Sequence, residues 1–438
     1  MIDSDALADA LCDYLPAQRW FSGSEGGDRP SLAIDRIEVM RDEFPALLQV
    51  VVSADGARYQ IVVGLRPVDS REAFLEGKPE AIIGELDTEL GAALAYDAAI
   101  DPELALHLLS VIAPEEQVER ARPLMVEQSN TSVVFDERLI MKLFRRLVDG
   151  PNPDAEISRA LVEVGFENVA GPVAEWRGDG TDYAVVNEFL VGGAEGFSLA
   201  LTSLRDLYDR RSAPDEAGGD FAFEARRLGV ITARMHVSLA EAFGTAPGNG
   251  GEWADAMDAH LRRVRHPEVD VEAVSAAYRR LREATDVGPA MRIHGDYHLG
   301  QVMRTDAGWH VLDFEGEPDR PLGERRAPSS PMRDVAGMAR SFHYAAQVAL
   351  REFGSEADEE LAALADAWEA RNTAAFIDGY LTADGVEAVL SAGDADRETA
   401  RIAFELDKAV YEVGYEQGHR PDWVGIPLSA VHRILERA

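Results

Sequence analysis

The residues best suited to chemistry lie in one stretch, residues 293–301, which read IHGDYHLGQ and are followed by VLDFEGEP at 311–318. Between them, two short apolar segments flank the turn residues 305–308, a pattern that predicts a β-hairpin. A hairpin would bring Asp296, Gln301 and Asp313 together at one end. Their oxygens would suit Mg²⁺, with one carboxylate free to orient a hydroxyl group. The pattern favours a catalytic metal site over a hairpin with solvated acids.

The use of lysine indicates two more positions. Of the 43 basic residues, only Lys78, Lys142 and Lys408 are lysines. The positions that keep lysine are candidates for a compact ammonium that a planar guanidinium cannot replace. Lys142 lies on the apolar segment 139–144, so its ammonium needs an anion. Lys78 lies in a Gly-Lys-Pro turn, where a surface position is expected.

The segment around Lys142 is typical of a nucleotide site. A helix that begins at residues 151–154 carries Glu156, and a strand lysine followed by a helix glutamate is the kinase arrangement, in which the lysine binds nucleotide phosphates. The polar loop 127–132 would cover the phosphates, although it lacks glycine. A polar turn and a surface lysine on an edge strand are the alternative. The predicted ATP-binding residues are Gln128, Ser129, Asn130, Thr131, Ser132, Lys142 and Glu156. The backbone of Glu188 and Leu190, at the end of the strand 183–190, is predicted to bind adenine.

A second helical face is suited to a sugar. At helical spacing Lys408, Tyr411, Glu412 and Tyr415 share one side, and Trp423 follows. Rings can stack on the C–H faces of a sugar while the polar groups take its hydroxyls. An exposed helix with a Lys408–Glu412 ion pair is the alternative. The predicted sugar-binding residues are Asp296, His298, Lys408, Tyr411, Glu412, Tyr415 and Trp423.

The helices and strands expected from the sequence would hold these groups in place. Residues 4–15 have helical spacing, and 31–83 read as the strands of a small antiparallel sheet. An Ala/Leu-rich helical section at 89–112 precedes the strands of 123–146, and the chain beyond 191 is mostly helical. We expect His236 in the core of its helix. For Asp334, at a helix start, stabilising that helix and bracing the catalytic loop are equally good interpretations.

Composition excludes several classes of protein. The net charge of −36 argues against nucleic acid and anionic membranes as partners. The sequence contains no apolar run long enough to span a bilayer and no signal-peptide pattern at its start. The single cysteine, Cys12, excludes an internal disulfide framework and a cysteine-based zinc cluster. A cytoplasmic protein is the simplest interpretation.

The catalytic stretch resembles the catalytic and metal loops of aminoglycoside phosphotransferases, with Gln301 in place of the usual asparagine and Asp313-Phe314-Glu315 in place of DFG. Over most of the chain the sequence is similar to bacterial maltokinases. The matching segments are QRWF at 18–21, the loop 127–132 with VVFD after it, KLFRR at 142–146, GGDF at 218–221, the block 293–342 and the block 406–428. One departure is at 24–26, Ser-Glu-Gly, where the family usually has a basic residue after the glycine.

The resemblance implies an α+β fold: a eukaryotic-protein-kinase-like bilobal fold with a β-rich N-terminal cap subdomain (1–88), a nucleotide-binding subdomain (89–190) and a helical C-terminal lobe (191–438). It implies ATP, Mg²⁺ and a disaccharide acceptor, and some relatives are fused to or assemble with trehalose synthase.

The leading hypothesis is phosphorylation of maltose at the anomeric hydroxyl, for α-glucan (glycogen) synthesis. Asp296 would be the catalytic base, and Gln301 and Asp313 would hold Mg²⁺. A kinase for glucosamine or an aminoglycoside is the alternative within the class, with extra carboxylates from Glu315, Glu317, Glu405, Glu412 and Glu416 to bind a cationic substrate. A pseudokinase subunit of a glucan enzyme complex is the alternative from another class.

Overall fold

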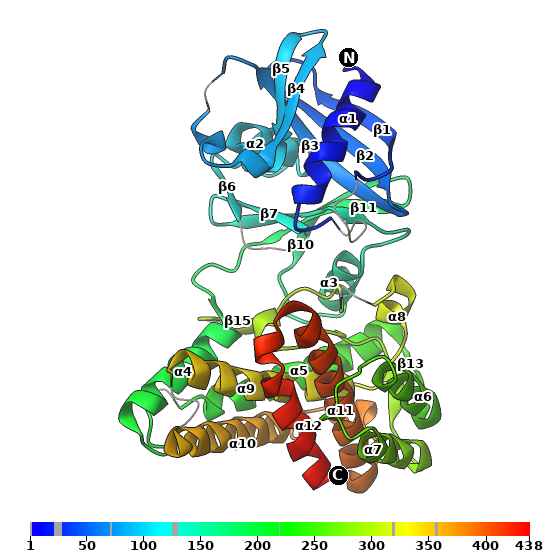
Figure 1. Cartoon of the computed structure of the whole chain (residues 1–438), viewed down its shortest axis with the longest axis vertical. Helices are drawn as coiled ribbons and strands as arrows, with labels where there is room; N and C mark the ends of the chain where they lie inside the picture. Colours follow the sequence, from blue (N-terminus) through cyan, green and yellow to red (C-terminus); the bar gives the residue numbers. More distant parts are fainter. Residues whose placement is uncertain are drawn as a thin grey trace. The chain divides into compact units, whose positions relative to one another are not determined.

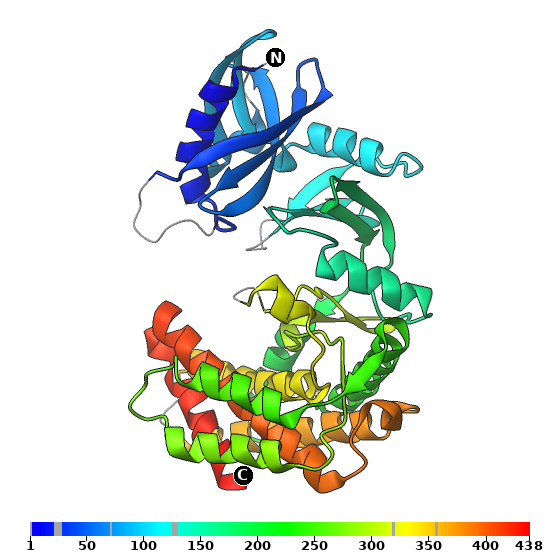
Figure 2. The ribbon, with the colours of Figure 1, turned by 90° about the vertical axis from the view of Figure 1, so that its right-hand side faces the viewer.

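The structure is a computed structural model that describes residues 2–21, 29–70, 72–124, 130–218, 220–317, 320–354 and 358–438. The chain divides into two compact units (Figure 1, Figure 2). The first contains Met1–Glu156 and Ala170–Val191, and the second contains Ile157–Val169 and Gly192–Ala438. None of the helices in the described ranges combines the length and apolar composition that crossing a membrane requires.

The first unit begins with a cap built on an antiparallel sheet. Within the described residues this sheet has six strands, in the order β1-β2-β3-β5-β4, with β9 beside β3. The strands are β1 Leu32–Arg41, β2 Ala46–Ala54, β3 Ala57–Pro67, β4 Ile82–Thr88, β5 Gly91–Asp97 and β9 Arg146–Leu147. Asp55 and Gly56 join β2 to β3 with φ angles of 48° and 80°. Positive φ at both positions is typical of a two-residue hairpin turn whose twist matches that of its strands.

The predicted N-terminal helix is present as α1, Ser4–Tyr14, which starts after the side-chain cap of Asp3. Its buried face, formed by Leu7, Leu11 and Tyr14, packs into a core with the cap strands. The apolar spacing of this segment therefore predicted the helix and the face that it buries.

The predicted helical section 89–112 is wrong in its first half. Residues Gly91–Asp97 form strand β5, which pairs with both β3 and β4, and only Pro102–Ile112 forms a helix, α2. The alanines of this strand favour a helix when taken locally. Two of them, Ala93 and Ala95, are fully buried within the sheet. Tertiary pairing thus overrides local propensity, and the cap sheet continues past residue 88.

A second antiparallel sheet completes the first unit. Within the described residues it has five strands in the order β10-β11-β8-β7-β6. The strands are β6 Ala121–Leu124, β7 Asn130–Phe135, β8 Leu139–Phe144, β10 Pro172–Gly178 and β11 Thr181–Glu188. The prediction of a loop at 127–132 is wrong for residues 130–132, because these residues belong to β7 and pair with residues 142–144 of β8. Helix α3, Pro153–Glu163, follows and contains the division between the two units.

The second unit is mainly helical. Its helices are α4 Gly196–Arg210, α5 Ala222–Phe243, α6 Gly250–Leu261, α7 Val271–Glu283, α8 Leu322–Arg326, α9 Met332–Glu352, α10 Glu359–Leu381, α11 Asp394–His419 and α12 Gly425–Arg437. Its short strands are β12 Ala194–Glu195, β13 Thr245–Pro247, β14 Pro289–Met291, β15 Val302–Thr305 and β16 Gly308–Val311. The antiparallel pairing of β15 with β16 confirms the hairpin predicted from the turn residues between them.

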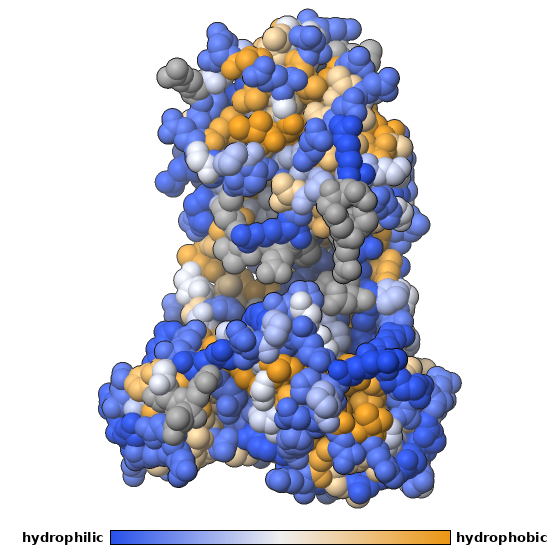
Figure 3. All heavy atoms as spheres, viewed as in Figure 1, coloured by the Kyte–Doolittle hydropathy of each residue, from blue (hydrophilic) through white to orange (hydrophobic). Residues whose placement is uncertain are grey.

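One large apolar core holds these helices together and includes residues from the start of the unit at Ile157 to Ile434 of α12. Hydrophilic side chains cover most of the face shown in Figure 3, with smaller apolar patches on both units. Hydrophilic side chains therefore lie mainly on the surface, around an apolar core.

Candidate active site

The candidate catalytic loop, which carries Asp296, runs from β14 to β15 in the second unit and packs against the first turns of α9. Gly295 has φ +85°, a conformation that side chains rarely adopt, so glycine fits the turn before Asp296. On α9, a Cβ at Gly337 would lie 2.7 Å from the backbone oxygen of Tyr297. Gly337 thus allows the loop backbone to lie close to the helix, and Gly295 allows the turn of the loop.

Asp334 ties the loop to α9. Its carboxylate accepts the backbone N–H of His294 at 2.8 Å and that of Gly295 at 2.9 Å, and it bonds Nε2 of His236 at 3.0 Å. Burial alone would raise the pKa of Asp334, but the His236 hydrogen bond and the backbone N–H groups hold that pKa below its ordinary value. Of the two interpretations of Asp334, the structure supports bracing of the loop. His236 is fully buried, as expected, and also bonds Tyr380 Oη at 2.8 Å.

A second bond joins the loop to the segment after β16. Nδ1 of His294 accepts the backbone N–H of Asp296 at 3.3 Å, and Nε2 lies 2.9 Å from the backbone oxygen of Leu312. A neutral imidazole with its proton on Nε2 satisfies both contacts. His294 therefore fixes Asp296 relative to the turn that carries Asp313.

Asp296 lies beside Lys408 of α11, 112 residues later in the chain. The Lys408 Nζ is 3.1 Å from Oδ1 of Asp296, and Nε2 of His298 is 3.8 Å from its Oδ2. Burial lowers the pKa of His298, against the opposite effect of the Asp296 carboxylate. The structure thus brings together three predicted residues, Asp296, His298 and Lys408.

Glu317 completes this group. Its carboxylate receives Lys408 Nζ at 2.7 Å and Arg333 at 3.0 Å, and it also pairs with Arg320. Burial would raise the pKa of Glu317, but these three cations hold that pKa far below its ordinary value. Burial would lower the pKa of Lys408, but the Glu317 and Asp296 carboxylates raise it, so the ammonium stays charged.

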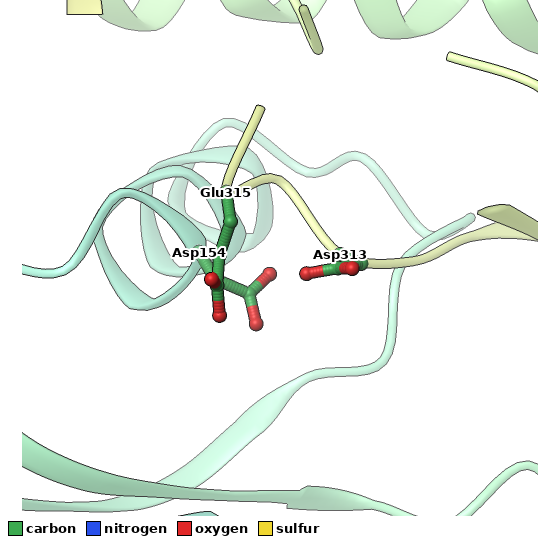
Figure 4. A group of neighbouring side chains, drawn as sticks. All are labelled: Asp154, Asp313 and Glu315. Atoms are coloured by element: carbon green, nitrogen blue, oxygen red, sulfur yellow. The ribbon is translucent and has the colours of Figure 1, made fainter. Parts of the chain in front are cut away.

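The predicted metal ligands lie together at the end of the hairpin. Gln301 Nε2 donates to Oδ2 of Asp313 at 3.1 Å. Asp313 has φ 60°, a left-handed conformation that is costly for a residue with a side chain and that is concentrated at functional sites. A carboxylate oxygen of Asp313 lies within 4.8 Å of one of Glu315, and Figure 4 shows both side chains on this turn. The two carboxylates make a hard donor set that fits Mg²⁺, and rotation of the Gln301 amide group, whose nitrogen here bonds Asp313, would add an amide oxygen to it.

On the predicted sugar face of α11, the aromatic rings stack on one another, whereas rings open to a sugar were expected. The Lys408 ammonium lies 5.1 Å from the ring centre of Tyr411, which stacks on Tyr415 at 6.3 Å. Tyr415 in turn stacks on His419 at 4.3 Å. The rings therefore cover one another's faces in part, so a sugar would meet their edges and hydroxyl groups as well as open faces.

The other two residues predicted for the sugar are held by arginines. Glu412 pairs with Arg340 of α9 at 2.6 Å. Trp423 stacks on Tyr344 at 6.2 Å, with the guanidinium carbon of Arg420 4.8 Å from its ring centre. The i,i+4 pair between Lys408 and Glu412, the alternative considered for this helix, is not the main contact of either residue, because Lys408 bonds Asp296 and Glu317.

The predicted nucleotide residues of the first unit lie around Lys142. Lys142 occupies the central strand β8, between β7 and β11, and its Nζ is 3.1 Å from Oδ2 of Asp154 in the first turn of α3. Glu156, assigned to this role from the sequence, lies two residues further along the same helix. The central position argues against the alternative of a surface lysine on an edge strand.

Other predicted ATP-binding residues have mixed positions. Gln128 and Ser129, like residues 24–26, lie outside the described residues. Asn130 and Ser132 are buried on β7, and the Thr131 hydroxyl accepts a bond from Arg145 at 2.8 Å. After β11, the backbone N–H groups of Glu188 and Phe189 bond within the unit. Any backbone contact with adenine here would therefore fall to the carbonyl groups and to Leu190.

Sequence reasoning did not name Asp154, considered Glu315 and Glu317 only as carboxylates for a cationic substrate, and left Asp334 between two interpretations. The spacing of the acids 313, 315 and 317 on one turn could have indicated Glu315 and Glu317. The pairing of Glu317 with Lys408 spans 91 residues, so no local pattern contains it.

Parts of the chain are similar to known families and known proteins. The family model of the maltokinase N-terminal cap domain matches residues 14–101, and that of the phosphotransferase enzyme family matches residues 214–400. A glucosamine kinase of Streptacidiphilus jiangxiensis is 29% identical over 411 residues, 89% of this chain and 88% of that protein. A glucosamine kinase of Mycolicibacterium smegmatis is 28% identical over 336 residues, 72% of this chain and 79% of that protein.

Solved structures of glucosamine kinase have the same fold. One, in complex with glucosamine, ADP and inorganic phosphate, has a TM-score of 0.68 at 23% identity, covering 98% of this chain and 99% of that one. Another crystal form has a TM-score of 0.71 at 24% identity, with the same coverage. The predicted fold class is confirmed: a β-rich cap, a kinase-like fold and a helical C-terminal region. The chain is therefore a sugar-kinase-like phosphotransferase in which residues 14–101 are similar to the maltokinase N-terminal cap domain and residues 214–400 are similar to the phosphotransferase enzyme family.

Proposed function

We propose that the protein transfers the γ-phosphoryl group of ATP to the anomeric hydroxyl of maltose, giving maltose 1-phosphate and ADP for α-glucan synthesis. Asp296 accepts the proton of the hydroxyl as its oxygen attacks the γ-phosphorus and the bond to the β–γ bridging oxygen breaks. Gln301, Asp313 and Glu315 would hold Mg²⁺, which when bound neutralises charge on the phosphates. Lys142, held by Asp154, would bind those phosphates.

The observation that supports a neutral acceptor is the charge around Asp296. The Lys408 ammonium bonds this carboxylate directly. Four acids that could have bound a cationic sugar are already paired with basic residues: Glu317 with Lys408, Glu405 with Arg401, Glu412 with Arg340 and Glu416 with Arg420. A protonated amino sugar would enter beside a fixed ammonium, and like charges repel.

Glucosamine is the second candidate, because the two relatives described above are named glucosamine kinase. The test is an acceptor screen with ATP and Mg²⁺ over maltose, glucosamine and glucose, with products identified by mass. Loss of reducing-end reactivity distinguishes anomeric from 6-phosphorylation. We expect maltose to have the highest kcat/KM and an anomeric product. A higher kcat/KM for glucosamine would replace maltose as the assigned acceptor.

Lys408→Met tests the charge argument within the same screen. Removing the ammonium should raise the maltose KM and lower the preference for maltose over glucosamine, by roughly tenfold for each ~1.4 kcal/mol of lost discrimination. Lys78→Met is the matched control, because that lysine lies in a turn of the cap. An unchanged maltose-to-glucosamine ratio in Lys408→Met would show that this ammonium does not select the acceptor.

Trehalose synthase, suggested by the resemblance, is proposed as a partner. Co-elution of the two purified proteins from a size-exclusion column is expected, and separate elution at micromolar concentrations would remove it.

A further inference from the structure

The buried carboxylate of Glu317 contacts three basic side chains, more than the single partner of a simple ion pair. Its side chain is 3% exposed, and its cations come from three places: Lys408 in α11, Arg333 at the start of α9 and Arg320 before α8. Burying a carboxylate is costly unless it is paired and hydrogen-bonded. The cations are also shared with other carboxylates, because Lys408 pairs with Asp296 as well as with Glu317.

The position of Glu317 in the chain links the candidate metal-binding segment to Lys408. Glu317 lies two residues after Glu315 and four after Asp313, on the segment that carries the candidate metal ligands. Through Lys408 it is joined to Asp296, because Nζ lies 2.7 Å from Oε1 of Glu317 and 3.1 Å from Oδ1 of Asp296. One ammonium therefore bridges the metal-binding segment and the catalytic carboxylate.

The bridge also fixes how Asp296 is presented. Lys408 bonds Oδ1, while Oδ2 faces His298 at 3.8 Å, too far for a hydrogen bond. Within the part of the chain that the structure describes, Oδ2 is thus the oxygen of Asp296 that is left to receive the proton of a hydroxyl group. Lysine side chains have four rotatable bonds, so without a second anchor the ammonium would sample several positions.

We propose that Glu317 is a positioning residue for phosphoryl transfer: it holds Lys408 against Oδ1 of Asp296, so that Oδ2 stays directed at the acceptor hydroxyl. The inference rests on the proposed phosphotransferase function, though not on maltose as the acceptor. The acceptor oxygen forms its bond to the γ-phosphorus, the γ-phosphorus loses its bond to the β–γ bridging oxygen, and the hydroxyl proton goes to Oδ2 of Asp296. Glu317 touches neither reactant and acts through Lys408.

The test is a double-mutant cycle of Glu317→Gln and Lys408→Met in the full chain, assayed with whichever acceptor the wild type phosphorylates fastest. Glu317→Gln alone should lower kcat by roughly tenfold to a hundredfold, the range expected when a reacting group is misplaced by about an ångström. The ATP KM should change less than threefold. In the Lys408→Met background the same change should lower kcat by less than threefold, because the residue through which Glu317 acts is gone.

Controls separate positioning from stability. Glu398→Gln is the matched control, because Glu398 also pairs with an arginine of α11 but is 54% exposed. Its kcat should equal that of the wild type. Glu317→Asp keeps the charge, serves if the glutamine variant does not fold, and should recover part of kcat relative to it. Equal fold-losses from Glu317→Gln in both backgrounds, or an unchanged kcat in the single variant, would overturn the inference. A wild type that phosphorylates maltose poorly but another sugar well would count against the proposed acceptor alone.

Discussion

At the scale of single residues, the central claim is that Asp296 accepts the proton of the acceptor. Asp296→Asn keeps the shape of the side chain and removes its basicity, so turnover should fall by roughly 10²–10⁴, the usual contribution of a positioned general base. Asp306→Asn is the control, because it makes the same change at the exposed turn between β15 and β16. Steady-state kcat in both variants checks the prediction. Equal turnover in Asp296→Asn and wild type would remove Asp296 from the mechanism.

The metal assignment is also a claim about individual side chains. Asp313→Asn replaces an anionic oxygen by a neutral amide in a donor set of one amide and two carboxylates. Mg²⁺ binds through carboxylates and substrate phosphates, so activity should require roughly tenfold or more Mg²⁺ for half-saturation. A Mg²⁺ titration at fixed ATP measures the shift. Superimposable curves for variant and wild type would show that Asp313 is not a ligand.

At the scale of elements, α9 matters because its first turn holds the catalytic loop through Asp334. Asp334→Asn replaces one accepting oxygen by an NH2 group and leaves at least one buried donor without an acceptor, at a cost of about 1–3 kcal/mol in the free energy of unfolding. The lowered pKa of Asp334 means that its carboxylate contributes stability above the unfolded value of about 3.9 and loses it as the pH falls through the folded value. The stability difference between wild type and variant should therefore be constant from about pH 7 to 5 and shrink below about pH 4. Urea unfolding at each pH measures it, and a difference independent of pH would contradict this role.

The elements also show how far the sequence leads. The β15–β16 hairpin, α1 and α9 could be predicted because turn residues and apolar periodicity are local. Strand β5 could not, since its alanines favour a helix until two neighbouring strands pair with it. The site divides in the same way. Residues near Asp296 in the sequence were identified, whereas Asp334 and Glu317 take their roles from contacts with segments 40 and 91 residues away.

At the scale of the whole molecule, the two units carry different parts of the proposed chemistry. Lys142 and Asp154 lie in the first unit, and Asp296, Lys408 and the candidate metal ligands lie in the second. A local pattern was enough to propose one residue in each unit, Lys142 and Asp296, because each lies on its own strand or loop. The acidic residues, by contrast, are spread over the whole sequence, so their charge affects the stability of the whole folded chain.

The last prediction concerns this charge. With 79 acidic and 43 basic residues the chain has a net charge of −36, and the mutual repulsion of its carboxylates destabilises the folded state. Raising NaCl from 0.1 to 1 M shortens the screening length from about 10 to about 3 Å. The weakened repulsion should outweigh the weakened ion pairs and raise the melting temperature at pH 7.5 by several degrees, since ~1 kcal/mol corresponds to ~2–4 °C in a large domain. The control is the same salt series near pH 4.5, where many carboxylates are protonated and the rise should be smaller. A melting temperature that stays constant or falls with NaCl at pH 7.5 would show that the acidic surface is balanced locally by its arginine pairs.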